Sequence, residues 1–93
     1  MKLKHILVKH KYEAEDVLRA LQGGKSFEEM AQKFSQCSSA KVGGDLGDLS
    51  KKKHLLDPDF LEAAEVLKVG QLSPLVRSSF GYHLIVRYDD YGK

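Results

Sequence analysis

The stretch Ser79-Phe80-Gly81-Tyr82-His83-Leu84-Ile85-Val86-Arg87-Tyr88 decides the fold of this chain. After its turn-forming glycine, β-branched and aromatic residues continue without Gly or Pro, which is typical of a buried strand. Side chains alternate between the two faces of a strand, so His83 and Ile85 share one side. Residues 4–8, Lys-His-Ile-Leu-Val, repeat this arrangement with His5 on an apolar strand. Pairing of the two strands would bring two histidines together, although a histidine on an apolar face is more often a hydrogen-bonded core residue than a catalyst.

Length and composition fit one small globular domain. We expect a single domain over residues 1–93, with one hydrophobic core. A hydrophobic content of 42% with 30% charged residues is typical of such a fold. The net charge of +2 comes from 15 basic and 13 acidic residues spread along the chain, without the long basic tail of many nucleic-acid binders. The run Lys51-Lys52-Lys53 is more often a solvated loop, so nucleic acid is not expected as a partner.

Cysteine content and hydropathy bear on the compartment. Cys37 is the only cysteine, so no internal disulfide can form and a reducing compartment is expected. No apolar run approaches the roughly 20 residues that span a bilayer, so no membrane association is expected. Met1 is followed directly by a predicted strand, which leaves no room for a secretion signal. We therefore expect a cytoplasmic protein.

The spacing of apolar residues predicts two helices after the first strand. Apolar residues at 14, 17, 18 and 21 form one helical stripe, which ends at Gly23-Gly24. A second stripe occupies positions 27, 30, 31 and 34, and Ser26 and Glu29 have the spacing of a capping box at its start. Residues 35–47 are rich in small side chains and glycines, which indicates an ordered loop leading into a short strand at 46–49.

The second half of the chain predicts one helix and two further strands. Asp57-Pro58 supplies an N-cap and a proline at the first helical position, and apolar residues at 60, 63, 64 and 67 form a stripe that Gly70 closes. Ser73-Pro74 starts an extended piece at 75–77, and a turn at 78–81 leads into the last strand. The order β-α-α-β-α-β-β predicts an α+β fold, in which helices cover a small mixed or antiparallel sheet.

Six segments of the chain together resemble the parvulins, a family of small peptidyl-prolyl cis/trans isomerases. They are His-Ile-Leu-Val at 5–8, Ser-Phe-Glu-Glu-Met-Ala at 26–31, Phe-Ser-Gln-Cys-Ser-Ser at 34–39, Gly-Gly-Asp-Leu-Gly at 43–47, Val-Gly-Gln-Leu-Ser-Pro at 69–74 and Phe-Gly-Tyr-His-Leu-Ile at 80–85. One such segment would be weak evidence, but six in the right order are specific. The resemblance implies a parvulin-like (FKBP-like) fold with a four-stranded, mostly antiparallel sheet wrapped by helices, which agrees with the predicted order.

The chemistry implied by the resemblance needs no cofactor. An X-Pro bond rotates slowly because amide resonance must be lost, at a barrier of about 18–20 kcal/mol. An enzyme can grip the proline ring in an apolar pocket, exclude water from the carbonyl and bind the twisted amide better than either planar form. The resemblance assigns a polar network to His5, Cys37, Ser78 and His83, and a proline pocket to Phe60 and Phe80, to which we add Leu56 as the favoured third residue.

Several of these residues also have a purely structural interpretation. On spacing alone, Phe60 is better explained by core packing, and only the resemblance moves it to the pocket. Cys37 could be a small buried hydrophobe. The family has Cys or Asp at that position, which favours a polar role over nucleophilic attack. Zinc held by His5, Cys37 and His83 is not expected, because their wide spacing lacks paired short-range ligands. The glycines at 43, 44 and 47 are better explained by positive φ and close backbone approach than by a phosphate loop.

Two departures from the family pattern bear on substrate choice. Members that select phosphoserine or phosphothreonine before proline carry a long basic insert after the first strand, where this chain has only Lys9-His10-Lys11. We predict no phosphate requirement, and neutral or apolar residues before proline. The spacing from Gly47 to Phe60 is also longer than in the family, whose members have a pocket methionine between these positions. Counting back from Phe60 places Leu56 at the methionine position, whereas counting forward from Gly47 places His54 there. We favour Leu56, because a proline pocket should be apolar.

Two functions remain as hypotheses. The leading one is a cofactor-free, monomeric prolyl isomerase that acts on unfolded or flexible proline-containing polypeptides. The alternative is a holdase, a peptide-binding module that uses the same groove with little catalysis. The presence of the whole polar set favours the enzyme, because binding alone would not need paired histidines.

Overall fold

Helices and strands follow one another in the predicted order. The computed structural model describes residues 2–48 and 57–88 of the chain. Its elements are β1 (Lys2–Val8), α1 (Lys11–Gln22), α2 (Phe27–Phe34), the 3-10 helix η1 (Ser38–Val42), β2 (Asp45–Asp48), α3 (Pro58–Glu65), β3 (Val76–Ser78) and β4 (Gly81–Arg87). The predicted order β-α-α-β-α-β-β is therefore confirmed. The short helix η1 lies in the segment that was predicted to be a loop.

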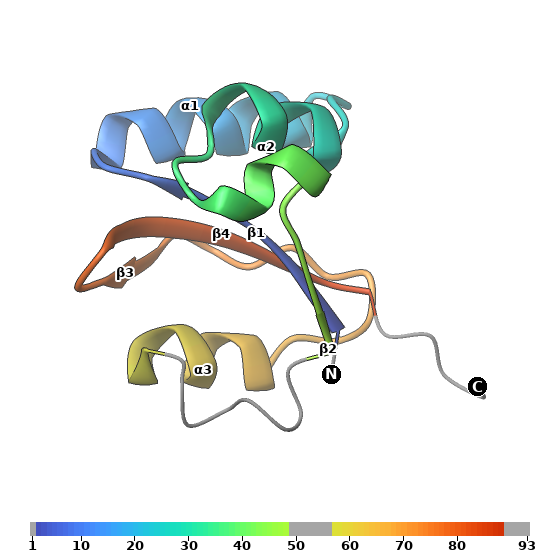
Figure 1. Cartoon of the computed structure of the whole chain (residues 1–93), viewed down its shortest axis with the longest axis vertical. Coiled ribbons are helices and arrows are strands. Elements are labelled where there is room, and N and C mark those ends of the chain that lie inside the picture. Colours follow the sequence, from blue (N-terminus) through green and yellow to red (C-terminus); the bar gives the residue numbers. More distant parts are fainter. Residues whose placement is uncertain (1, 49–56, 89–93) are drawn as a thin grey trace.

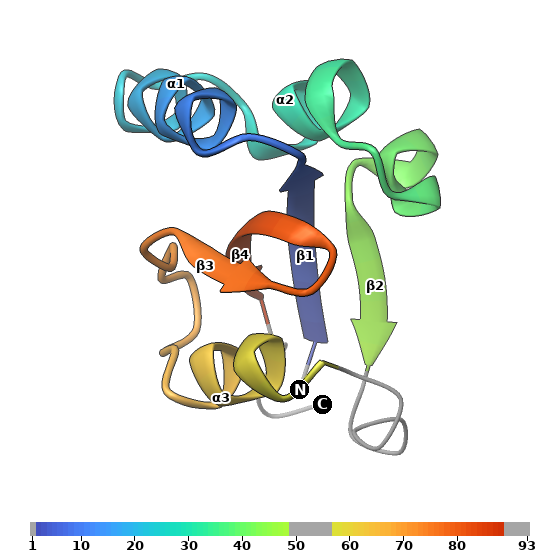
Figure 2. The ribbon, with the colours of Figure 1, turned by 90° about the vertical axis from the view of Figure 1, so that its left-hand side faces the viewer.

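One four-stranded sheet, in the order β2-β1-β4-β3, forms the centre of the molecule (Figure 2). Every strand pair is antiparallel, and the central pair runs in register from Leu3 opposite Arg87 to Val8 opposite Tyr82. The first and last strands of the chain are thus neighbours, as the sequence suggested.

Helices cover both faces of this sheet (Figure 1). Helices α1 and α2 lie over one face and bury one part of the core: Ile6, Val8, Ala14, Val17, Met30, Ala31 and Leu84. Helix α3 lies over the other face and buries a second part: Leu3, Phe60, Ala64, Leu67, Val76 and Ile85. Because strand side chains alternate, the odd-numbered residues of β1 and β4 point towards α3. His5 and His83 belong to that set.

The predicted cap of α3 is confirmed, whereas the predicted capping box of α2 forms only in part. The Ser26 hydroxyl accepts a hydrogen bond from the Glu29 N–H at 3.3 Å. The Glu29 carboxylate does not accept from the Ser26 N–H, which would complete the capping box, and lies 3.6 Å from the ammonium of Lys33. Asp57 caps α3 by accepting from the Asp59 N–H at 2.9 Å.

The helices of the described ranges are all too short or too polar to cross a bilayer.

Helix α3 ends earlier than its apolar stripe predicted. The last helical residue is Glu65, whereas Leu67 lies beyond the helix and is still buried. Gly70 has a φ of +82° and turns the chain so that its N–H donates to the carbonyl of Arg87. The stripe therefore marked buried positions correctly but placed the end of the helix too late.

The glycine-rich approach to β2 packs directly against β1. Gly43, Gly44 and Gly47 all have positive φ, as predicted. The His5 N–H donates to the Gly44 carbonyl at 2.9 Å. A Cβ at position 44 would overlap the His5 carbonyl oxygen, so only glycine allows this approach. The loop thus lies beside the strand segment that carries His5.

Candidate active site

Two buried histidines form the floor of the site. The rings of His5 and His83 stack with centroids 5.3 Å apart and an interplanar angle of 20°. Their Nδ1 atoms are 3.2 Å apart, so one ring donates and the other accepts a hydrogen bond. Because His5 pairs opposite Ile85 and His83 opposite Leu7, the two histidines meet diagonally across the central strand pair.

Burial keeps these two imidazoles neutral. His5 is 5% exposed and His83 is 4% exposed. Burial, assisted by the neighbouring His83, lowers the pKa of His5 from 6.5 to about 4. Burial also lowers the pKa of His83, although the charge of Asp57 opposes that effect. At neutral pH the pair therefore acts as hydrogen-bonding groups rather than as cations.

Ser78 extends the histidine pair into a chain of three polar side chains. Its Oγ lies 2.6 Å from His83 Nε2 and also accepts from the Phe80 N–H at 3.2 Å. If the Ser78 hydroxyl donates to His83 Nε2, then His83 Nδ1 carries the ring proton and donates to His5 Nδ1. If His83 Nε2 instead donates to Ser78, then His5 Nδ1 donates to His83 Nδ1. The tautomers of the two rings are thus coupled, and both rings are fixed in orientation.

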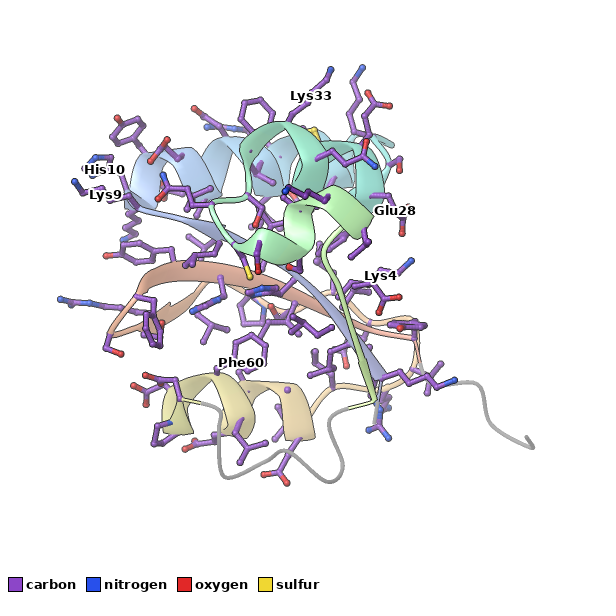
Figure 3. The ribbon with its side chains drawn as sticks, viewed as in Figure 1. Lys4, Lys9, His10, Glu28, Lys33 and Phe60 are labelled. Atoms are coloured by element: carbon purple, nitrogen blue, oxygen red, sulfur yellow. The ribbon has the colours of Figure 1, made fainter. Side chains whose placement is uncertain are left out.

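Phe60 is both a core residue and a wall of the site. Its ring meets the rings of His5 and His83 edge-on, at centroid distances of 5.5 and 5.1 Å. It is 4% exposed and projects from α3 towards the sheet (Figure 3). Phe60 therefore belongs to the core, as its spacing predicts, and also lines the cavity, as the family resemblance predicts. Phe80, by contrast, lies in the β3–β4 turn and is 70% exposed.

A cavity of about 260 Å³ opens between α3, the sheet and the β3–β4 turn. Its lining residues are His5, Leu7, Cys37, Leu46, Asp57, Phe60, Phe80 and His83. Five residues predicted for the site therefore meet around one cavity, and Ser78 contacts it through His83. Leu56, and its alternative His54, lie outside the described residues.

Three lining residues were not predicted for the site. Leu7 could have been found, because it lies two positions after His5 on the same face of β1. Leu46 comes from the edge strand β2, and nothing in its sequence context places it near α3. Asp57 was recognised only as a helix cap, since its position at the cavity depends on how α3 meets the sheet.

The segment before Cys37 is fastened to β1. The Leu7 N–H donates to Ser35 Oγ at 3.0 Å, and the Gln36 N–H donates to the Leu7 carbonyl at 2.7 Å. The Cys37 N–H then approaches Ser35 Oγ at 3.4 Å. These bonds place the half-exposed thiol at the cavity, on the same side as His5. Within residues 2–48 and 57–88, no three His, Cys, Asp or Glu side chains form a group suited to a metal ion.

Comparison with known proteins assigns the family. Residues 5–89 match the family model described as Rotamase: PPIC-type PPIASE domain. This chain belongs to the PPIC-type peptidyl-prolyl isomerase family. The assignment confirms the predicted parvulin fold and the predicted isomerase function of the PPIC-type domain.

Among similar proteins, the foldase protein PrsA of Bacillus subtilis (strain 168) is 41% identical over 93 residues, which are 100% of this chain and 32% of PrsA. PrsA of Clostridium botulinum (strain Loch Maree / Type A3) is 45% identical over 91% of this chain and 25% of that protein. The PPIC-type domain thus spans about a third or less of the curated relatives that it matches.

Solved structures show the same fold. The crystal structure of PrsA from Bacillus subtilis matches with a TM-score of 0.89 at 39% identity, over 100% of this chain and 36% of that one. The solution structure of NmPin, the parvuline of Nitrosopumilus maritimus, matches with a TM-score of 0.82 at 38% identity, over 96% of this chain and 95% of that one. The PPIC-type domain therefore corresponds to part of PrsA and to nearly all of NmPin.

Proposed function

We propose that this domain accelerates rotation about X-Pro bonds in unfolded or flexible polypeptides without forming a covalent intermediate. The observation that carries the proposal is an apolar cavity whose floor is a neutral, hydrogen-bonded histidine pair. Such a cavity can hold a proline ring against Phe60 while the preceding carbonyl lies near the polar side chains.

The main catalytic effect is preferential binding of the twisted amide. The planar amide is strongly polar because of its resonance, and rotation removes that resonance. The twisted form therefore loses less hydration free energy than the planar form when water is withdrawn from it. A cavity that excludes water therefore favours the transition state over both ground states. Each tenfold acceleration requires about 1.4 kcal/mol of this preference.

The polar residues hold the geometry of the cavity. The chain Ser78–His83–His5 fixes both rings, so Phe60 packs against a rigid surface. Cys37 supplies a weak polar group beside the substrate carbonyl, and covalent attack is unnecessary because no bond has to break. In this scheme the histidines shape the cavity and do not exchange protons with the substrate.

The lining of the cavity also supports the prediction that phosphate is not required. Among the described lining residues there is no Lys or Arg, whereas Asp57 contributes a carboxylate. A phosphate before proline would meet this negative charge at the rim. Neutral or apolar residues before proline are therefore the proposed preference. A monomeric state, a cytoplasmic location and a lack of nucleic-acid binding stay predictions from the sequence.

The test is isomerisation of short X-Pro peptides with X as Leu, Ala, Glu or phosphoserine, measured for the protein and for His83→Ala. We expect acceleration with Leu or Ala ahead of phosphoserine, and a slower variant. A phosphorylated peptide that is turned over much faster than its unphosphorylated twin would refute the proposed preference. A folded protein that binds these peptides without accelerating them would instead support the holdase hypothesis.

A second pair of variants tests the pocket position that the structure does not describe. Leu56→Ala should weaken turnover more than His54→Ala, because the proline pocket should be apolar. The opposite ranking would assign the pocket position to His54.

A further inference from the structure

The carboxylate of Asp57 links two elements that each contribute an aromatic residue to the lining of the cavity. One oxygen, Oδ1, accepts from the Asp59 N–H at 2.9 Å and so caps α3. The other, Oδ2, accepts from the Ser79 hydroxyl at 2.9 Å and from the Ser79 N–H at 3.5 Å. Asp57 lies three residues before Phe60, and Ser79 directly precedes Phe80. The link therefore joins the helix that carries one aromatic wall to the turn that carries the other.

We propose that Asp57 is a positioning residue, which holds the β3–β4 turn in its substrate-binding conformation before substrate arrives. This proposal rests on the proposed function, since it concerns how the same cavity binds a proline peptide. The bonds from Asp57 to Ser79 set the separation of Phe60 and Phe80, and hence the width of the cavity.

The tip of the turn, Ser79 and Phe80, lies beyond the last paired residues of the hairpin, Ser78 opposite Gly81, so strand pairing does not hold it. Phe80 is 70% exposed, so core packing does not fix its side chain. The preceding strand β3 is only three residues long. Within the turn, the Phe80 N–H donates to Ser78 Oγ at 3.2 Å. A turn that is free to move would have to be ordered when substrate binds, and that cost would weaken binding.

The charge of Asp57 strengthens the link. The Ser79 hydroxyl is the main cause that lowers the pKa of the Asp57 carboxyl, and backbone N–H groups of Asp59, Ser79 and Phe60 add to it. The carboxylate is therefore ionised at neutral pH, and hydrogen bonds to an ionised acceptor are the stronger kind. Loss of either partner should accordingly loosen the turn.

Two variants weaken the link and keep a helix cap: Asp57→Ser removes both bonds to Ser79, and Ser79→Ala removes the hydroxyl bond alone. Asp57→Ser retains a good N-cap side chain, but its hydroxyl is too short to reach Ser79 as well. Ser79→Ala keeps Asp57 and removes the hydroxyl donor. Ser26→Ala is the matched control, because it removes the cap of α2, which lies outside the cavity. All three variants, and the double variant, are compared with the unmodified protein on an Ala-Leu-Pro-Phe peptide.

We expect each variant at the link to raise KM by roughly three- to tenfold, with kcat within about twofold, because the bound substrate itself orders the turn. The double variant should resemble Asp57→Ser, since that variant already removes both bonds of the link. Ser26→Ala should leave KM unchanged. An unchanged KM in Asp57→Ser, additive effects in the double variant, or an equal rise of KM in Ser26→Ala would overturn the proposal.

A second measurement separates this proposal from the proposed function. Amide ¹⁵N relaxation of Phe80 reports the order of the turn in the free protein, whether or not the protein catalyses isomerisation. We expect an ordered amide in the unmodified protein, and increased motion in Asp57→Ser and Ser79→Ala alone. Equal order in all variants would refute the role of Asp57, whereas failure of the unmodified protein to isomerise any peptide would refute the proposed function only.

Discussion

Lowering the pH should destabilise this protein through His5. Burial lowers the pKa of His5 to about 4, whereas an unfolded histidine has a pKa near 6.5. Between these values the unfolded chain binds a proton that the folded protein excludes. The stability that is present above pH 6.5 is therefore lost as the pH falls towards 4. Each unit below 6.5 costs about 1.4 kcal/mol, so the loss from His5 at pH 5 is about 2 kcal/mol.

The assay is urea unfolding at pH 7.5 and pH 5.0 for the unmodified protein, His5→Asn and Leu3→Val. His5→Asn removes the titrating group. Between pH 7.5 and pH 5.0 its free energy of unfolding should therefore fall by about 2 kcal/mol less than that of the unmodified protein. Leu3→Val weakens the same strand at a fully buried position and keeps both histidines. It should therefore show the full pH-dependent loss from a lower starting stability.

An equal loss in His5→Asn and in the unmodified protein would refute the reasoning, because it would mean that the folded protein does not exclude a proton from His5. NMR titration of the His5 ring gives an independent check. Its midpoint should lie near 4. The lowered pKa of His83 acts in the same direction and is retained in both comparison variants.

Three further predictions follow from burial and backbone geometry. Phe60→Ala should cost about 3–5 kcal/mol of unfolding free energy in urea titrations, whereas Phe80→Ala should change it by less than about 0.5 kcal/mol and raise KM. Ser78→Ala should lower kcat/KM by roughly 5- to 30-fold in peptide assays, because one ring nitrogen of the histidine pair loses its partner; unchanged kinetics would contradict its role. Gly44→Ala should lower the free energy of unfolding by at least ~3 kcal/mol, because the new Cβ meets the backbone of His5. Gly24 also has positive φ but lies in open space, so Gly24→Ala should lower it by only about 1 kcal/mol. Equal losses in urea titrations would contradict this explanation.

The parts of the fold that were predictable are those with a local physical signal. The alternation of faces placed His5 and Ile6 on opposite sides of β1, and the structure buries them towards different helices. Asp57-Pro58 located the start of α3 within one residue. The end of α3 was less predictable, because an apolar stripe marks buried positions and Leu67 stays buried after the helix has ended.

The site was less predictable, because it depends on contacts between distant residues. Nothing local indicates that Ser78 contacts His83, and only the family resemblance selected it for the polar network. The partner of Asp57 is Ser79, 22 residues further along the chain. Such a bond depends on how a helix and a turn meet over the sheet, which neither composition nor spacing encodes.

The pairing of β1 with β4 means that the site forms late in the folding of a newly made chain. The two histidines are 78 positions apart in sequence, and their strands meet only after all intervening residues exist. Closing so long a loop is entropically costly, and contacts of this range slow folding. A growing chain therefore carries no partial activity until residues 81–87 are free to pair. Truncation of the last strand should abolish fold and catalysis together rather than in steps.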